Sequence, residues 1–141
     1  MKRNLLENTL VVEAIEPVNN TGAAITGDTV DRLGYQSAIL QYHAAAASGS
    51  PDTATTALTV QHGDASNMSD AATFYAVETA LDIDAAAVDK AYVLDLSGAK
   101  RYIRVTADAT YTGGSSPANV QAATWVLGDK NVELVDAANN V

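Results

Sequence analysis

Apolar and polar residues alternate along most of the chain, and short clusters of Gly, Ser, Asn and Pro interrupt this alternation at close intervals. A period of two places successive side chains on opposite faces, as in a β-strand with one buried face. The pattern predicts about eight short strands, over residues 9–16, 24–30, 35–45, 57–62, 73–79, 90–96, 101–107 and 120–127. We therefore expect an all-β fold, an antiparallel β-sandwich of the jelly-roll kind, because long amphipathic helices are missing from the pattern.

Two of the predicted strands depart from simple alternation. In residues 35–45, Leu40 and Tyr42 fall on one face, but Ile39 places an apolar side chain on the other. Residues 120–127 carry apolar side chains on both faces. A strand that is apolar on both faces is expected at the centre of a sheet or at an interface between subunits.

Turn signals predict two hairpins. Ser48–Asp52, which contains Gly and Pro, lies between the third and fourth predicted strands, and Ser97-Gly98 lies between the sixth and seventh. Residues 81–89 include three consecutive alanines and could form a single helical turn.

The chain has 141 residues, the length of one ordinary domain. We expect residues 9–141 to form a single β-sandwich domain and residues 1–8 to form a mobile N-terminal arm, because a terminus that is not tied down is normally mobile. No apolar run approaches the roughly 20 residues of a membrane-spanning helix, so no membrane partner is expected.

The balance of charge is strongly acidic. Eight Lys and Arg residues stand against 17 Asp and Glu residues, which gives a net charge of −9. Proteins that bind the phosphate backbone do so with Lys and Arg, so no nucleic-acid partner is expected. Half of the cations are Lys90, Lys100, Arg101 and Arg104, and none lies in residues 33–89.

Catalytic and metal-binding motifs are not evident in the sequence. It contains neither cysteine, nor a G-x-S-x-G nucleophile motif, nor a phosphate-binding loop, so we expect no enzyme activity, no cofactor and no metal. Two alternatives for metal remain open: His43 and His62 could meet across the predicted hairpin together with Asp64, and the acidic residues 82–89 could hold calcium. Exposed histidines on strands and a solvated acidic loop are the simpler interpretations.

Four blocks of the sequence resemble small proteins of tailed phages and prophages. The blocks are Leu33–Leu40, Leu58–Asp64, Gly98–Val105 and Val126–Asp129, and their order and spacing match over about residues 10 to 130. The resemblance is to head-decoration, or capsid-stabilising, proteins. It implies a structural protein on the outer surface of a phage capsid, assembled in the host cytoplasm, with the major capsid protein as its partner. Capsid lattices offer three-fold positions, so we expect a homo-oligomer, a homotrimer, with the outward face of residues 120–127 as a surface to bury.

Five cations are candidates for contact with the capsid. Lys2 and Arg3 lie on the predicted arm, and Lys100, Arg101 and Arg104 lie on or beside one predicted strand. Their positive charges could pair with capsid carboxylates. The alternative is a carbohydrate-binding module on the virion surface, because six tyrosines and one tryptophan could supply rings that stack on sugars.

Overall fold

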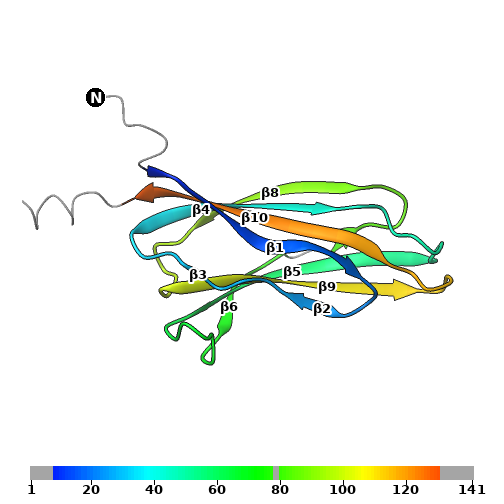
Figure 1. The fold of residues 1–141 in the computed structure, drawn as a ribbon, viewed down its shortest axis with the longest axis horizontal. Coiled ribbons are helices and arrows are strands. Elements are labelled where there is room, and N and C mark those ends of the chain that lie inside the picture. The colour runs from blue at the N-terminus through cyan, green and yellow to red at the C-terminus, as the bar shows by residue number, and fades with distance from the viewer. Residues whose placement is uncertain (1–7, 78–79, 131–141) are drawn as a thin grey trace, which may run out of the picture.

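Two antiparallel sheets packed face to face form the protein (Figure 1). The structure is a computed structural model that describes residues 8–77 and 80–130. Sheet A contains, in spatial order, β1 (Leu10–Asn20), β10 (Asn119–Lys130), β4 (Tyr35–Ala44) and β8 (Val88–Asp95). Sheet B contains β2 (Ala24–Thr26), β9 (Tyr102–Thr112), β5 (Thr53–Gly63) and β6 (Ala72–Ala76), with β3 (Val30–Asp31) also paired to β9 and β7 (Leu81–Asp82) also paired to β5.

The connections between strands are those of a jelly roll. Most successive strands alternate between the two sheets, and the strands that begin and end the described part, β1 and β10, lie side by side. The ten strands of the described residues occupy eight strand positions, because β2 and β3 both pair with β9, and β6 and β7 both pair with β5. The expected all-β antiparallel sandwich is confirmed.

Both predicted hairpins are wrong. β4 pairs with β10 and β8 in sheet A, whereas β5, which follows it, pairs with β9 in sheet B. β8 and β9 likewise belong to different sheets. The turn signals mark real reversals, but each reversal carries the chain across the sandwich instead of to a neighbouring strand in the same sheet.

Two further local predictions differ from the structure. Residues 81–89 contain the short strand β7, a bend and the start of β8, not a helical turn. β1 continues past Pro17, where it had been expected to stop, because the register between β1 and β10 shifts between Ile15 and Val18. A proline has no N–H to donate, and a bulge is one of the few places in a sheet that tolerate it.

The core lies between the inward faces of the sheets. Its largest fully buried side chains include Trp125, Leu40 and Tyr42 from sheet A and Leu58 and Ile103 from sheet B. These are the residues that the alternation places on inward faces. Many of the remaining core positions are alanines, such as Ala38 and Ala107, which explains how an alanine-rich chain forms a sheet protein.

A buried polar network joins the loops at one end of the sandwich. The Gln121 amide donates to Thr56 Oγ1 at 3.1 Å and to Asn119 Oδ1 at 2.8 Å. The Tyr111 hydroxyl donates to Asn119 Oδ1 at 2.7 Å and lies 3.0 Å from the carbonyl oxygen of Asn20. These hydrogen bonds hold the ends of β1, β9 and β10 together across the two sheets.

Candidate functional site

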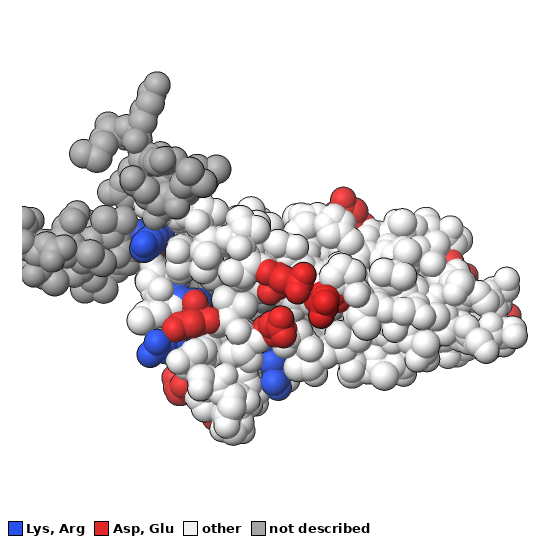
Figure 2. Space-filling view, viewed as in Figure 1, with Lys and Arg blue, Asp and Glu red and all other residues white. Residues whose placement is uncertain are grey.

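Three of the predicted capsid contacts lie at the end of the sandwich opposite this polar network. Lys100 and Arg101 stand at the entrance to β9, and Arg104 lies within it. Charged side chains gather toward this end, where β1 begins and β10 ends, while most of the other half of the same view is uncharged (Figure 2).

Lys100 and Arg101 are already paired with carboxylates of the chain itself. The Lys100 Nζ lies 3.1 Å from Asp64 Oδ2 and 3.4 Å from Asp70 Oδ2. The Arg101 Nη2 lies 2.8 Å from Asp31 Oδ2, and its guanidinium stacks over the Tyr102 ring at 5.2 Å. The hydrogen bond from Arg101 lowers the pKa of Asp31, so this carboxylate stays ionised. These two cations therefore tie loops of sheet B together.

Arg104 has a different environment. Its Nε donates to Gln61 Oε1 at 2.7 Å, and among the described residues no carboxylate pairs with it. The side chain is half-buried on the outer face of sheet B. Of the three described candidates, Arg104 is the one whose charge is available to a partner. Lys2 and Arg3 lie outside the described residues.

Sequence reasoning did not single out Arg32, which has a structural role at the same end. Its Nε donates to the carbonyl of Lys100 at 2.7 Å and its Nη1 to the carbonyl of Tyr35 at 3.1 Å, while Nη2 donates to the carbonyl of Ala99. One guanidinium thus fastens the β3–β4 turn to the β8–β9 turn. An isolated arginine in a turn carries no sequence signal for such a role.

The two histidines do not meet. His43 lies on β4 in sheet A and His62 on β5 in sheet B. The His62 Nδ1 accepts a hydrogen bond from the Lys100 backbone N–H at 3.2 Å. Within residues 8–77 and 80–130 no three His, Asp or Glu side chains are grouped as metal ligands, so the paired-histidine alternative fails on geometry.

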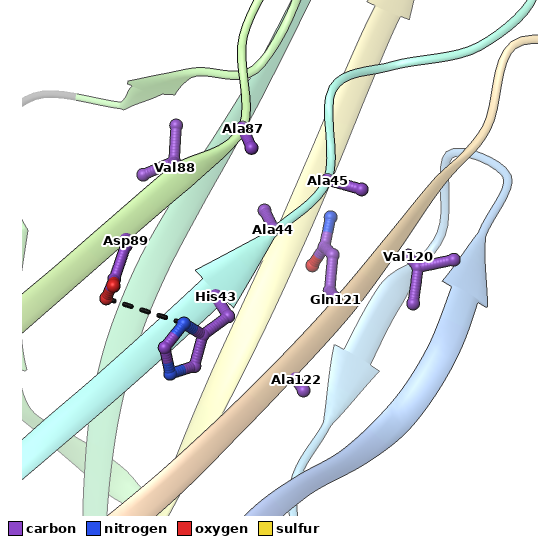
Figure 3. Close-up of a pocket in the computed structure, with 9 residues that line it drawn as sticks. All are labelled: His43, Ala44, Ala45, Ala87, Val88, Asp89, Val120, Gln121 and Ala122. Atoms are coloured by element: carbon purple, nitrogen blue, oxygen red, sulfur yellow. Dashed lines mark ion pairs between the residues drawn. The ribbon is translucent and has the colours of Figure 1, made fainter.

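A shallow depression of about 330 Å³ lies where β4 ends and β8 begins. Figure 3 shows its lining, which is mostly alanine and valine, with His43 and Asp89 at one side. The His43 Nδ1 lies 3.4 Å from Asp89 Oδ1, and both side chains are more than half exposed. The depression is open and lacks the converging polar groups of a small-molecule site.

The aromatic side chains do not form one platform among the described residues. Trp125 and Tyr42 are fully buried in the core, and Tyr111 belongs to the polar network. Burial raises the pKa of Tyr42 to about 12. Tyr75 is exposed on β6, and Tyr102 stacks with Arg101 on sheet B. This distribution does not favour the carbohydrate-binding alternative, which needs exposed rings side by side.

Sheet A presents a feature that sequence reasoning noticed only in part. Of the seven large apolar side chains exposed on the described surface, five lie on its strands: Val11, Val18, Ile39, Val93 and Val120. Two features of the sequence indicated this apolar surface: Ile39, which breaks the alternation of its strand, and residues 120–127, which are apolar on both faces. Recognising a shared surface required the register between strands.

Comparisons with known proteins identify the fold. No family model matches the chain, and no curated protein matches it in sequence. Among solved structures, a chain of the T13 particle of infectious bursal disease virus shares the fold with a TM-score of 0.61 and 11% identity over 88% of this chain. A structure of the Gt strain of that virus gives 0.59 and 12%, and the VP2 subviral particle gives 0.54 and 11%. The chain spans about a third of the length of these viral proteins, with coverage of 31% to 33%.

No helix in the described residues is long and apolar enough to cross a membrane.

Proposed function

We propose that this chain is a structural virion protein that binds the outer surface of a bacteriophage capsid and stabilises it. The observation that carries the proposal is the fold match: 88% of the chain superimposes on part of a chain of a virus particle. The order of four sequence blocks, which resembles that of phage head-decoration proteins, supports the more specific role. The role is structural because the matched solved chains are components of virus particles.

The proposed partner is the major capsid protein, met on the capsid surface after assembly in the host cytoplasm. Of the three described candidates, Arg104 is the best placed to pair with a capsid carboxylate, because Lys100 and Arg101 are occupied by Asp64, Asp70 and Asp31. An arm of residues 1–8 carrying Lys2 and Arg3 would add a second, weak contact. Repetition of weak contacts over a lattice raises the total affinity.

Binding to isolated heads tests the proposal. Heads prepared without this protein are mixed with the intact protein, with a form lacking residues 1–8, and with Arg104→Ala. We expect the intact protein to co-sediment with the heads and to raise their melting temperature, and each variant to bind more weakly. Lys90→Ala, which removes one positive charge from β8, is the matched control and should bind like the intact protein.

Two outcomes would count against the proposal. If the intact protein neither co-sediments with heads nor stabilises them, the capsid role is wrong. If both variants bind as tightly as the intact protein, the role survives but the contact surface lies elsewhere. The homotrimer expected from the sequence rests on analogy with three-fold lattice positions and stays a prediction.

A further inference from the structure

A continuous apolar row crosses the outer face of sheet A. Val11 on β1 is the register partner of Val126 on β10, Val126 is the partner of Ile39 on β4, and Ile39 is the partner of Val93 on β8. Partners that stand directly opposite in antiparallel strands project from the same face of a sheet. The row therefore runs from one edge of sheet A to the other.

This row points to solvent. The neighbouring residues Leu40, Leu94 and Leu127 are buried in the core, so the alternating positions face outward. Val93 is 79% exposed, Val11 63% and Ile39 38%. Each strand of sheet A contributes one β-branched aliphatic side chain at the same level, so the four side chains form a continuous row. Contiguous exposed apolar surface of this kind marks an interaction site.

The side chains on either side of the row are mostly short and uncharged. On one side lie Thr124, Gln41 and Ala91, with Glu13 at the β1 edge. On the other side lie Gly128 and Ser37, with Asp95 at the β8 edge. Carboxylates thus stand only toward the two edges near the row. No lysine or arginine lies among the paired residues directly beside the row, and Lys130, the register partner of Tyr35, stands four residues beyond Val126 on β10.

We propose that the outer face of sheet A packs against the same face of a second copy of this chain, about a two-fold axis that lies along the row. In that arrangement each residue of the row meets its own counterpart. Asp95 of one copy then lies opposite Ala91 of the other copy, and Glu13 of one copy lies opposite the start of β1 in the other. Because no two carboxylates are opposed, molecules with a net charge of −9 can approach each other at this face. A two-fold contact requires one self-complementary surface, which the row supplies.

The size of the face places the contact among small interfaces. Four strands about 4.8 Å apart, over about eight residues with a rise of about 3.4 Å, give roughly 500 Å² per copy and roughly 1,000 Å² in total. This is near the lower limit of specific interfaces, so we expect a dimer with a dissociation constant on the order of 10 μM. Face-to-face packing of two sheets is itself a common arrangement of β-proteins.

Sedimentation velocity over a range of concentrations tests the proposal with the intact chain. We expect the wild-type protein to shift from monomer to dimer as the concentration rises through the micromolar range. Val93→Glu and Val11→Glu change opposite edges of the row, and each should leave the protein monomeric. Val93→Thr keeps a β-branched side chain and should weaken the dimer only in part. Thr110→Glu places the same added charge on the exposed outer face of sheet B and should dimerise like the wild type.

Circular dichroism and melting temperature confirm that each variant is folded. A wild-type protein that stays monomeric at several hundred μM, well above the expected constant, would overturn the proposal. A trimer would overturn it too, in favour of the homotrimer predicted from the sequence, which would bury the same outward face of residues 120–127. Dimers that survive both Val93→Glu and Val11→Glu would place the contact on another surface. None of these outcomes depends on binding to capsids, so the dimer contact and the capsid role are tested separately.

Discussion

The side chain of Arg32 links two separate turns of the backbone, its own and the one between β8 and β9. Its guanidinium donates to three carbonyl oxygens, those of Tyr35, Ala99 and Lys100. The planar fork of arginine makes several such bonds in fixed directions, whereas the single ammonium of lysine cannot reproduce them. Arg32 is therefore a structural residue, while Arg101, on the neighbouring turn, is an exposed partner of Asp31.

Arg32→Lys should lower the free energy of unfolding by about 1 to 3 kcal/mol, because carbonyl groups lose charge-assisted donors. Urea denaturation followed by circular dichroism measures the change. Arg101→Lys is the matched control, and since its ion pair with Asp31 is exposed, the expected change is below about 1 kcal/mol. If the free energy of unfolding fell equally in the two variants, the hydrogen bonds from Arg32 to the carbonyls would contribute no more than an exposed ion pair.

Asp70 should make stability depend on pH at the acidic end. Backbone N–H groups of Asp64 and Ala65 donate to this carboxylate at 2.8 Å and 3.1 Å, and these bonds lower its pKa from 3.8 to about 2. A carboxyl whose pKa is lower in the folded state stabilises the fold above pH 3.8, and this contribution disappears as the pH falls from 3.8 toward 2. Melting temperatures measured from pH 6 to about pH 2 should fall less steeply at the acidic end in Asp70→Asn than in the wild type. Identical pH profiles would contradict this role of Asp70.

At the scale of strands, the sequence predicted the faces well and the partners poorly. The inward residues of β4, β9 and β10 follow from period-two alternation, because burial is decided residue by residue. The hairpins failed because a turn signal fixes where the chain reverses, not which strand it meets. The loop of residues 45–52 is long enough to cross to the other sheet, and its Ser48 bonds to Ala118 in the β9–β10 loop.

For the candidate site, too, the sequence indicated the residues but not their partners. Sequence reasoning found Lys100 and Arg101 as a basic group, but Asp31, Asp64 and Asp70, which pair with them, are distant in the chain. The apolar row was equally hidden, because its four residues come from four strands and become neighbours only through the register. Non-local pairing, which single-sequence patterns do not encode, accounts for both omissions.

An engineered disulfide tests the pairing of β1 with β10. Glu13 and Thr124 are direct register partners, and the chain has no cysteine of its own. Glu13→Cys with Thr124→Cys should form a disulfide on mild oxidation and raise the free energy of unfolding by about 4 to 5 kcal/mol, because it closes a loop of about 110 residues. Free-thiol quantification and urea denaturation measure the two effects.

The matched control places the second cysteine one strand further away. Glu13→Cys with Gln41→Cys puts the two positions on β1 and β4, with β10 between them. Strands separated in this way lie about 10 Å apart, too far for a disulfide. A bond in the control but not in the test pair would show that the strand order is wrong.

For the molecule as a whole, the topology should make folding slow. Both sheets are built from strands that are distant in the chain, with β1 beside β10 and β5 beside β9. Long loops must close before such pairs form, so we expect folding on the millisecond to second timescale. Trp125, the chain's one tryptophan and fully buried, reports the process by stopped-flow fluorescence. Complete folding in microseconds would be inconsistent with this topology.

The placement of the lysines and arginines also determines where trypsin could cleave this protein. Trypsin cuts only after Lys and Arg, and residues 33–89 contain neither, so β4, β5, β6 and β7 have no internal cleavage site. Arg32, Lys100 and Arg101 flank the surrounding turns, where carbonyls and carboxylates hold their side chains, and Arg104 lies inside a paired strand. The same bonds that fasten the turns therefore restrict digestion, and a nick at Arg32 or Lys90 would leave a large fragment still paired to its neighbours.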